Sequence, residues 1–163
     1  MRWMVLIVMV LACGREPTCN FIPKIDVPKF TRQCTVSQLG KVIDPEILEL
    51  VSDFSKEAMA RNVPCAHTPK MEFVDSHFPE NPSVLGYCTY FVDVVLVREY
   101  WNWLTPESRR TLIYHELGHC ALLQGHTDPS ITSIMNPYIL SDGVSVPNWD
   151  MLVNNLFAGE PQE

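Results

Sequence analysis

Two histidines and a glutamate stand at a spacing that suits metal-assisted hydrolysis: His115, Glu116 and His119. On a helix, residues four apart lie about 40° apart around the axis. Both imidazoles would then face one metal ion, while Glu116 stands beside them and stays free for proton transfer. The pattern predicts a zinc hydrolase site in which the glutamate acts on water rather than on the metal.

A helix is predicted around this motif, from about Thr105 to Gln124. Thr105 suits the N-cap, Pro106 suits the first helical position, and Glu107 favours the positive end of the helix dipole. The second half is apolar nearly all round, which is typical of a helix buried in a core. Buried imidazole and carboxylate groups are costly to desolvate unless something pairs with them, and a metal ion would meet that requirement.

A catalytic zinc site usually has three protein ligands and one open position, so a third ligand is needed. Gly125 is expected to end the helix in the left-handed conformation, and His126 follows it directly. His126 is therefore the favoured third ligand, with Asp128 as the main alternative. Cys120 points about 120° away from the histidine pair and is expected in the core or in a disulfide.

The segment from His115 to Tyr138 resembles the active site of the metzincin zinc endopeptidases. Their pattern is H-E-x-x-H-x-x-G-x-x-H followed by a methionine turn, and Ser-Ile-Met at 133–135 resembles that turn. The second half departs, because Leu122 replaces the family glycine and the third histidine comes one residue late. The resemblance implies that Met135 is a structural floor under the zinc and that Tyr138 belongs to the wall of the specificity pocket.

By this resemblance, Zn²⁺ is held by His115, His119 and His126, and Glu116 is the general base that hydrolyses a peptide or protein substrate. Two other interpretations stay open. One is a non-catalytic, zinc-stabilised binding protein of the cell envelope, and the other is a zinc amidase acting on cell-wall peptides. Glu116 argues against the first, because a structural zinc site closes its fourth position with Cys or His and needs no adjacent base.

The first residues predict export. An apolar run from Trp3 to Ala12 follows a basic start and matches a secretory signal in length, being too short to span a bilayer. Residues 1–12 are therefore expected to be a signal peptide. The run ends in Val-Leu-Ala-Cys, which resembles a bacterial lipoprotein cleavage box with Cys13 as the lipidated residue. An ordinary signal or an uncleaved anchor is the alternative, so the protein is expected in the cell envelope on a lipid anchor, or secreted.

Export affects how the cysteines are interpreted. The chain has six cysteines, and an odd number remains if Cys13 carries lipid. An oxidising compartment favours one or two disulfides, whose pairing the sequence leaves open. Cys19 or Cys34 could also occupy the zinc as a latency switch, like that of some metzincin zymogens. The residues around Cys34 match that motif poorly, so plain disulfide use is favoured.

One domain is expected over residues 34–159, after a Pro-containing tether at 13–33 and before a tail at 160–163. An amphipathic helix is predicted from Asp-Pro-Glu at 44–46 to a stop at 62–64. Residues 71–75 and 84–98 predict three strands, with a turn near Val92 and Asp93, and 148–157 a short closing helix. The expected fold class is α+β: a minimal metzincin-like domain whose small mixed sheet packs on the N-terminal helix and the active-site helix.

Charge adds one exclusion. The chain has 12 Lys and Arg against 19 Asp and Glu, a net charge of −7. Nucleic acid is not expected as a partner, because its binding is dominated by basic contacts to phosphates. His67 and His77 fall outside the motif and are expected to be exposed or structural, with lining of the cleft as an alternative for His77.

Overall fold

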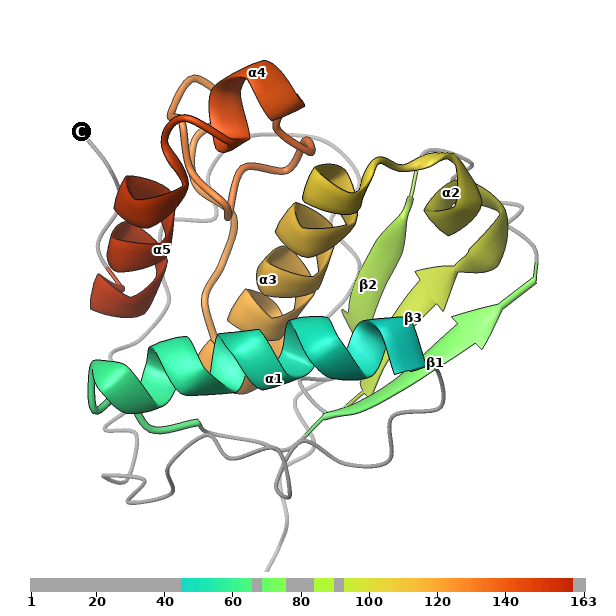
Figure 1. The fold of residues 1–163 in the computed structure, drawn as a ribbon, viewed down its shortest axis with the longest axis horizontal. Coiled ribbons are helices and arrows are strands. Elements are labelled where there is room, and N and C mark those ends of the chain that lie inside the picture. The colour runs from blue at the N-terminus through green and yellow to red at the C-terminus, as the bar shows by residue number, and fades with distance from the viewer. Residues whose placement is uncertain (1–44, 66–68, 76–83, 90–92, 160–163) are drawn as a thin grey trace, which may run out of the picture.

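The computed structural model describes residues 45–65, 69–75, 84–89 and 93–159, which form a mixed α+β fold (Figure 1). The elements in these ranges are α1 (Pro45–Ala60), β1 (Lys70–Val74), β2 (Gly86–Thr89), β3 (Asp93–Val97), α2 (Arg98–Trp103), α3 (Pro106–Leu122), α4 (Asp142–Ser145) and α5 (Trp149–Ala158). The α+β class is confirmed. The predicted signal peptide, tether, tail and lipidation site lie outside the described residues, as do Cys19, Cys34, His67 and His77.

The sheet is small and mixed, as expected. Its strand order is β1-β3-β2, with β3 parallel to β1 and antiparallel to β2. The central strand β3 is buried over Val94–Val97. A nearly continuous apolar run is typical of a strand covered on both faces. Because β2 pairs with β3 alone, it forms one edge of the sheet within the described part of the chain.

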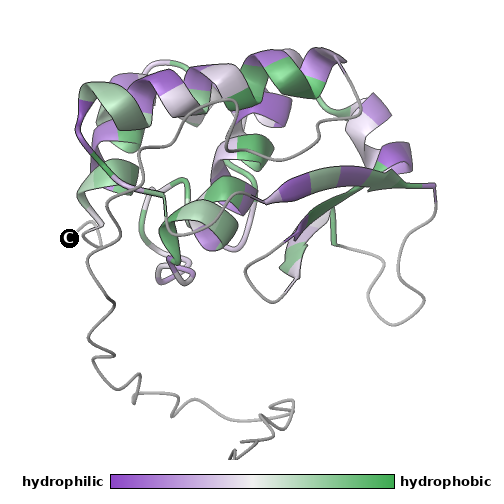
Figure 2. Cartoon of the chain, turned by 90° about the horizontal axis from the view of Figure 1, so that it is seen from below, coloured by the Kyte–Doolittle hydropathy of each residue, from purple (hydrophilic) through white to green (hydrophobic). Residues whose placement is uncertain are grey.

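Helix α1 crosses in front of α3 (Figure 1), and its apolar face supplies much of the core. Buried residues recur along α1 at helical spacing, namely Ile47, Val51, Phe54 and Ala58. Figure 2 shows the matching alternation of hydrophilic and hydrophobic residues along this helix. The ring of Phe54 packs against Tyr114 of α3 and Phe157 of α5, with centroids 5.2 and 5.0 Å away. The predicted amphipathic helix is confirmed, and it joins α3 to α5.

Two short helices escape the sequence analysis, α2 and α4. The predicted strand region at 84–98 ends one residue early, because Arg98 begins α2. Segments of six and four residues are too short to show a helical period, and tertiary contacts decide their conformation. In α2 that contact is the buried Trp101, whose ring meets Phe73 edge-on at 5.6 Å. In the described part of the chain, no helix has the length and apolar character needed to cross a bilayer.

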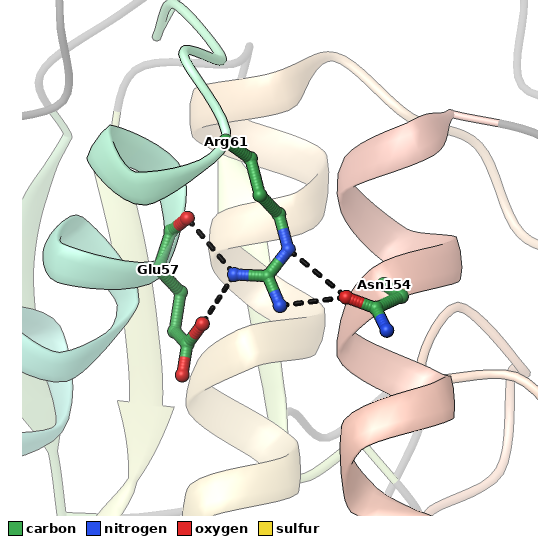
Figure 3. A network of polar contacts seen from close by, with 3 residues as sticks. All are labelled: Glu57, Arg61 and Asn154. Atoms are coloured by element: carbon green, nitrogen blue, oxygen red, sulfur yellow. Dashed lines mark hydrogen bonds and ion pairs between the residues drawn. The ribbon is translucent and has the colours of Figure 1, made fainter.

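A polar network fastens the end of α1 to α5 (Figure 3). The Arg61 guanidinium donates to the Glu57 carbonyl at 3.1 Å and to the Glu57 carboxylate. It also donates twice to Asn154 Oδ1, at 3.1 and 2.7 Å. The guanidinium carbon lies 5.5 Å from the centroid of Phe157. One side chain therefore links two helices that are 93 residues apart in the sequence at Arg61 and Asn154.

Replacing Arg61 tests this link. Arg61→Ala is expected to lower the free energy of unfolding by about 1–2 kcal/mol, because the hydrogen bonds of the guanidinium to Glu57 and to the Asn154 amide are lost together. Lys56→Ala is the control, since its exposed ion pair with Asp53 should contribute little to stability. Urea denaturation of both variants measures the difference. Equal losses would show that the network adds no more than a surface ion pair.

Candidate metal centre

Helix α3 begins as the sequence indicates. Thr105 is its N-cap, accepting a hydrogen bond from the Ser108 N–H at 3.1 Å, and Pro106 occupies the first turn. From Thr111 to Gly118 every residue is buried. The His-Glu motif therefore lies on a helix that runs through the core, as predicted.

The structure brings the three predicted histidines together. Nε2 of His119 lies 3.0 Å from Nε2 of His115 and 3.1 Å from Nε2 of His126, and the third side of the triangle is 3.2 Å. Tetrahedral zinc with bonds of about 2.0–2.1 Å separates its nitrogen ligands by roughly 3.3 Å. The triangle thus has the size for one ion, and these histidines form a group that could hold a metal.

Backbone carbonyls orient two of these rings. Nδ1 of His115 donates to the Ile134 carbonyl, and Nδ1 of His119 donates to the Gln124 carbonyl, each at 2.7 Å. A carbonyl can only accept, so the proton resides on Nδ1 and the Nε2 lone pair faces its neighbours. Lone pairs that face one another at this distance repel unless a cation lies between them. The donor set therefore fits a divalent metal that prefers neutral nitrogen ligands, as zinc does.

Burial keeps the imidazoles neutral. Desolvation, followed by the neighbouring His119, lowers the pKa of His115 to about 4. Burial also lowers the pKa of His119 and of His126 from the ordinary value. Neutral imidazole is the form that binds a metal, so the set needs little deprotonation at neutral pH.

The helix ends earlier than predicted, and Gly125 does not end it. α3 stops at Leu122, and Leu123 takes the left-handed conformation with φ 59° and ψ 34°. Gly159 is the only glycine with positive φ in the described part of the chain. A left-handed L-residue costs about 1–2 kcal/mol. Here the N–H groups of Leu123 and Gln124 both donate to the Gly118 carbonyl, which offsets part of that cost.

Asp128 does not join the histidines. Its carboxylate accepts from the Ser130 N–H at 2.8 Å and from the Ser130 hydroxyl at 2.6 Å, and these bonds lower its pKa. This side chain closes a turn of its own two residues beyond His126. Of the two candidates for the third ligand, the structure therefore places His126 in the group.

The methionine turn braces both sides of the site. Ile134 supplies the carbonyl for His115, and the Met135 carbonyl accepts from the Thr127 N–H at 2.9 Å, directly after His126. The buried Met135 side chain packs on α3 at Gly118, where a Cβ would lie only 2.4 Å from its sulfur. Sequence analysis did not single out Gly118. A glycine inside a helix costs about 1 kcal/mol relative to alanine, and that anomaly is the signal for close packing.

Glu116 is buried beside the histidines with one oxygen unpaired. The residue is 3% exposed, and its Oε2 has no hydrogen-bond partner in the described structure. Burial raises the pKa of Glu116 to about 8. Its Oε1 would lie 3.2 Å from a Cβ at Gly86 of β2, so a glycine there allows the close approach of strand and carboxylate. Gly86 is a second residue that sequence reasoning missed, although a glycine inside a strand is a usable signal.

The histidines and Glu116 open onto a cleft of about 640 Å³. One wall is β2 with the residues before it, and the other follows the methionine turn. Tyr138 is 71% exposed on the second wall, next to Pro137 and Ile139. The full lining comprises Val84, Leu85, Gly86, Tyr87, Cys88, Leu112, His115, Glu116, His119, His126, Asn136, Pro137, Tyr138 and Ile139. Most of the cleft surface is apolar. The group of side chains in it that could bind a metal is the three histidines.

A disulfide ties one cleft wall to the helix that carries the histidines. Cys88 of β2 is bonded to Cys120 of α3, across 32 residues of sequence. The expectation that Cys120 lies in the core or in a disulfide is confirmed on both counts. Cys65 is disulfide-bonded as well. None of these three sulfurs is therefore free to act as a thiolate ligand.

Comparison with protein-family models, with curated proteins and with solved structures finds no match. The support for a metal site is therefore the geometry of the three histidines in this chain.

Two glycines give a matched test of the methionine turn. Gly118→Ala is expected to lower the free energy of unfolding by about 1–3 kcal/mol, because the added methyl group must displace Met135 from a packed core. Gly125→Ala should be neutral, since nothing lies within 4 Å of its Cβ position and its φ is not positive. Thermal denaturation of the metal-free proteins measures both. A destabilising Gly125→Ala would contradict the observed end of α3.

Proposed function

We propose that this protein hydrolyses peptide bonds with a zinc ion held by His115, His119 and His126, as a small metzincin-like metalloendopeptidase. One observation carries the proposal: three Nε2 atoms converge within 3.0–3.2 Å beside a buried carboxyl group that lines an open cleft and has one unpaired oxygen. A site that only binds a metal ion needs no carboxyl group beside its ligands.

The chemistry that zinc supplies when bound is Lewis acidity, which makes water acidic near neutral pH and polarises a carbonyl. The chain's own contribution is to keep three neutral nitrogens aimed at one point. The carbonyls of Ile134 and Gln124 do this for the two histidines of α3. Hydrogen bonds of this kind also raise the basicity of the ligating ring.

Glu116 is the proposed general base. It neighbours His115 on α3 and lines the cleft, and a carboxylate in such a position can take a proton from attacking water. The same carboxyl group can then give that proton to the departing amine. Burial raises the pKa of Glu116, which helps this carboxyl group to retain the proton until the amine departs.

The shape of the cleft favours an extended peptide as substrate. β2 runs along the cleft and pairs with β3 alone among the described strands. An extended segment can add to such an edge through main-chain hydrogen bonds. Its side chains would meet a mostly apolar wall, and Tyr138 is the proposed wall of the specificity pocket.

A purely structural zinc site is less well supported. Such sites are closed by a fourth Cys or His. Cys120, the cysteine next to His119, is committed to Cys88, and the grouped ligands of the described part are three histidines only. The fourth position would therefore face the cleft.

We also propose that the protein works outside the reducing cytoplasm. Disulfides persist in oxidising compartments, and Cys65, Cys88 and Cys120 are all oxidised. This supports the export expected from the N-terminal signal. The lipid anchor on Cys13 remains a proposal that rests on its cleavage box alone.

Replacing the base separates catalysis from metal binding. Glu116→Gln is expected to keep one zinc per chain while hydrolysis of casein or a peptide library falls by roughly 10²–10⁴-fold, the contribution of general acid–base catalysis. Glu107→Gln, on the exposed first turn of α3, is the control and should keep full activity. Normal turnover by Glu116→Gln would refute the assignment. Cleavage of cell-wall peptides without cleavage of the library would favour a zinc amidase.

The third ligand is tested by a pair of variants. His126→Ala is expected to abolish stoichiometric zinc binding, because two histidines leave the ion short of a ligand. Asp128→Asn should keep zinc, since Asp128 serves a turn with Ser130 rather than the histidine group. Metal analysis after dialysis measures both. Zinc loss in Asp128→Asn with retention in His126→Ala would reverse the ligand assignment.

A further inference from the structure

The chain between the second and third histidines is shaped by Gln124. Its N–H donates to the Gly118 carbonyl at 3.0 Å, and its carbonyl accepts from His119 Nδ1 at 2.7 Å. Its side-chain Nε2 donates to the carbonyl of Leu156 in α5. Within the described part of the chain, Gln124 is the residue of this loop that hydrogen-bonds both to a proposed ligand and to a separate helix.

The partner of that side chain lies at the end of α5. The last carbonyls of a helix lack helical N–H partners. The Leu156 carbonyl accepts from the Gly159 N–H at 3.3 Å and from Gln124, so the amide completes this helix end. α5 lies beside α3 (Figure 1), and the Leu156 side chain packs at Gly118, between the two histidines of α3 in sequence. Helix α5 is therefore docked on the turn of α3 that carries the proposed ligands.

We propose that Gln124 is a positioning residue, whose side chain anchors the loop to α5 so that its own carbonyl meets His119. This proposal rests on the metal site of the proposed function and extends it. Leu123 is left-handed without being glycine, so the local backbone does not favour this reversal by itself. The bond to Leu156 supplies a tertiary restraint at the next residue. The docking of α5 thereby sets the aim of the second histidine.

A simpler role is general packing of α5 against the domain. Asn154 offers the control for it, because this residue joins α5 to Arg61 and is absent from the cleft. Loss of Asn154 should loosen the same helix without touching the loop at Gln124. If Gln124 is a positioning residue, the loss of its side chain and the loss of Asn154 should differ in their effect on zinc affinity and not in their effect on stability.

The test compares four full-length proteins: wild type, Gln124→Ala, Gln124→Lys and Asn154→Ala. Zinc affinity is measured by chelator competition, and the site is followed by the absorption spectrum of bound Co²⁺. Gln124→Ala should bind zinc about tenfold more weakly with an altered Co²⁺ spectrum, as expected when support behind a ligating histidine is lost. Gln124→Lys, which keeps a donor for the Leu156 carbonyl, should recover most of the affinity. Asn154→Ala should stay within about twofold of wild type, because it leaves the histidine support intact.

Wild-type affinity in Gln124→Ala, or an equal loss in Asn154→Ala, would overturn the proposal. A readout that needs no metal keeps it separate from the proposed function. In the metal-free protein, imidazole ¹⁵N shifts should show the proton of His119 on Nδ1 in wild type and shared between both nitrogens in Gln124→Ala. If wild-type protein binds no zinc, the proposed function fails, while unchanged imidazole shifts in Gln124→Ala are what would refute the role of Gln124.

Discussion

The site depends on two hydrogen bonds from imidazole to backbone, His115 to Ile134 and His119 to Gln124. These bonds decide which ring nitrogen carries the proton, and so which lone pair points inward. Without them, the i and i+4 spacing would bring two rings to one side of α3 with no control of their tautomers. The Ile134 carbonyl is placed by the methionine turn and the Gln124 carbonyl by the loop against α5. Segments far from the motif thus define the chemistry of the motif.

Several unfavourable features of the domain lie at this site. Glu116 is buried with an unpaired oxygen, His115 is buried, and Leu123 is left-handed. Strain and desolvation of this kind are typical of functional sites, where surrounding structure must compensate. The Cys88–Cys120 disulfide provides such compensation, since closing a loop of its 32-residue separation stabilises the folded state by about 3–4 kcal/mol. This disulfide lies at the cleft, because Cys88 is one of the residues that line the cleft.

Both walls of the cleft are tied to the elements that hold the histidines. The disulfide joins β2 to α3. The buried Asn136 joins the opposite wall to the loop after His126. The Asn136 amide donates to the carbonyls of Pro129 and Ile131 at 2.9 Å, and its Oδ1 accepts from the Tyr138 N–H at 3.0 Å. The loop after His126 and the wall that carries Tyr138 therefore form one hydrogen-bonded unit. A substrate in the cleft would meet walls held in place relative to the three histidines.

Sequence alone determined what depends on neighbouring residues. The cap at Thr105, the apolar stripe of α1 and the shared face of His115 and His119 follow from helical geometry, which is local. The need for a third ligand just after the helix pointed to His126, and the structure brings it to the other two histidines. Tertiary structure decided the rest: the end of α3 at Leu122, the pairing of Cys88 with Cys120, the close approaches at Gly86 and Gly118, and the brace at Asn136. The disulfide and the two close approaches depend on partners remote in the sequence, and periodicity and capping rules carry no information about which remote segment will arrive there. The end of α3 and the bonds of Asn136 lie in loops, where no periodic pattern applies.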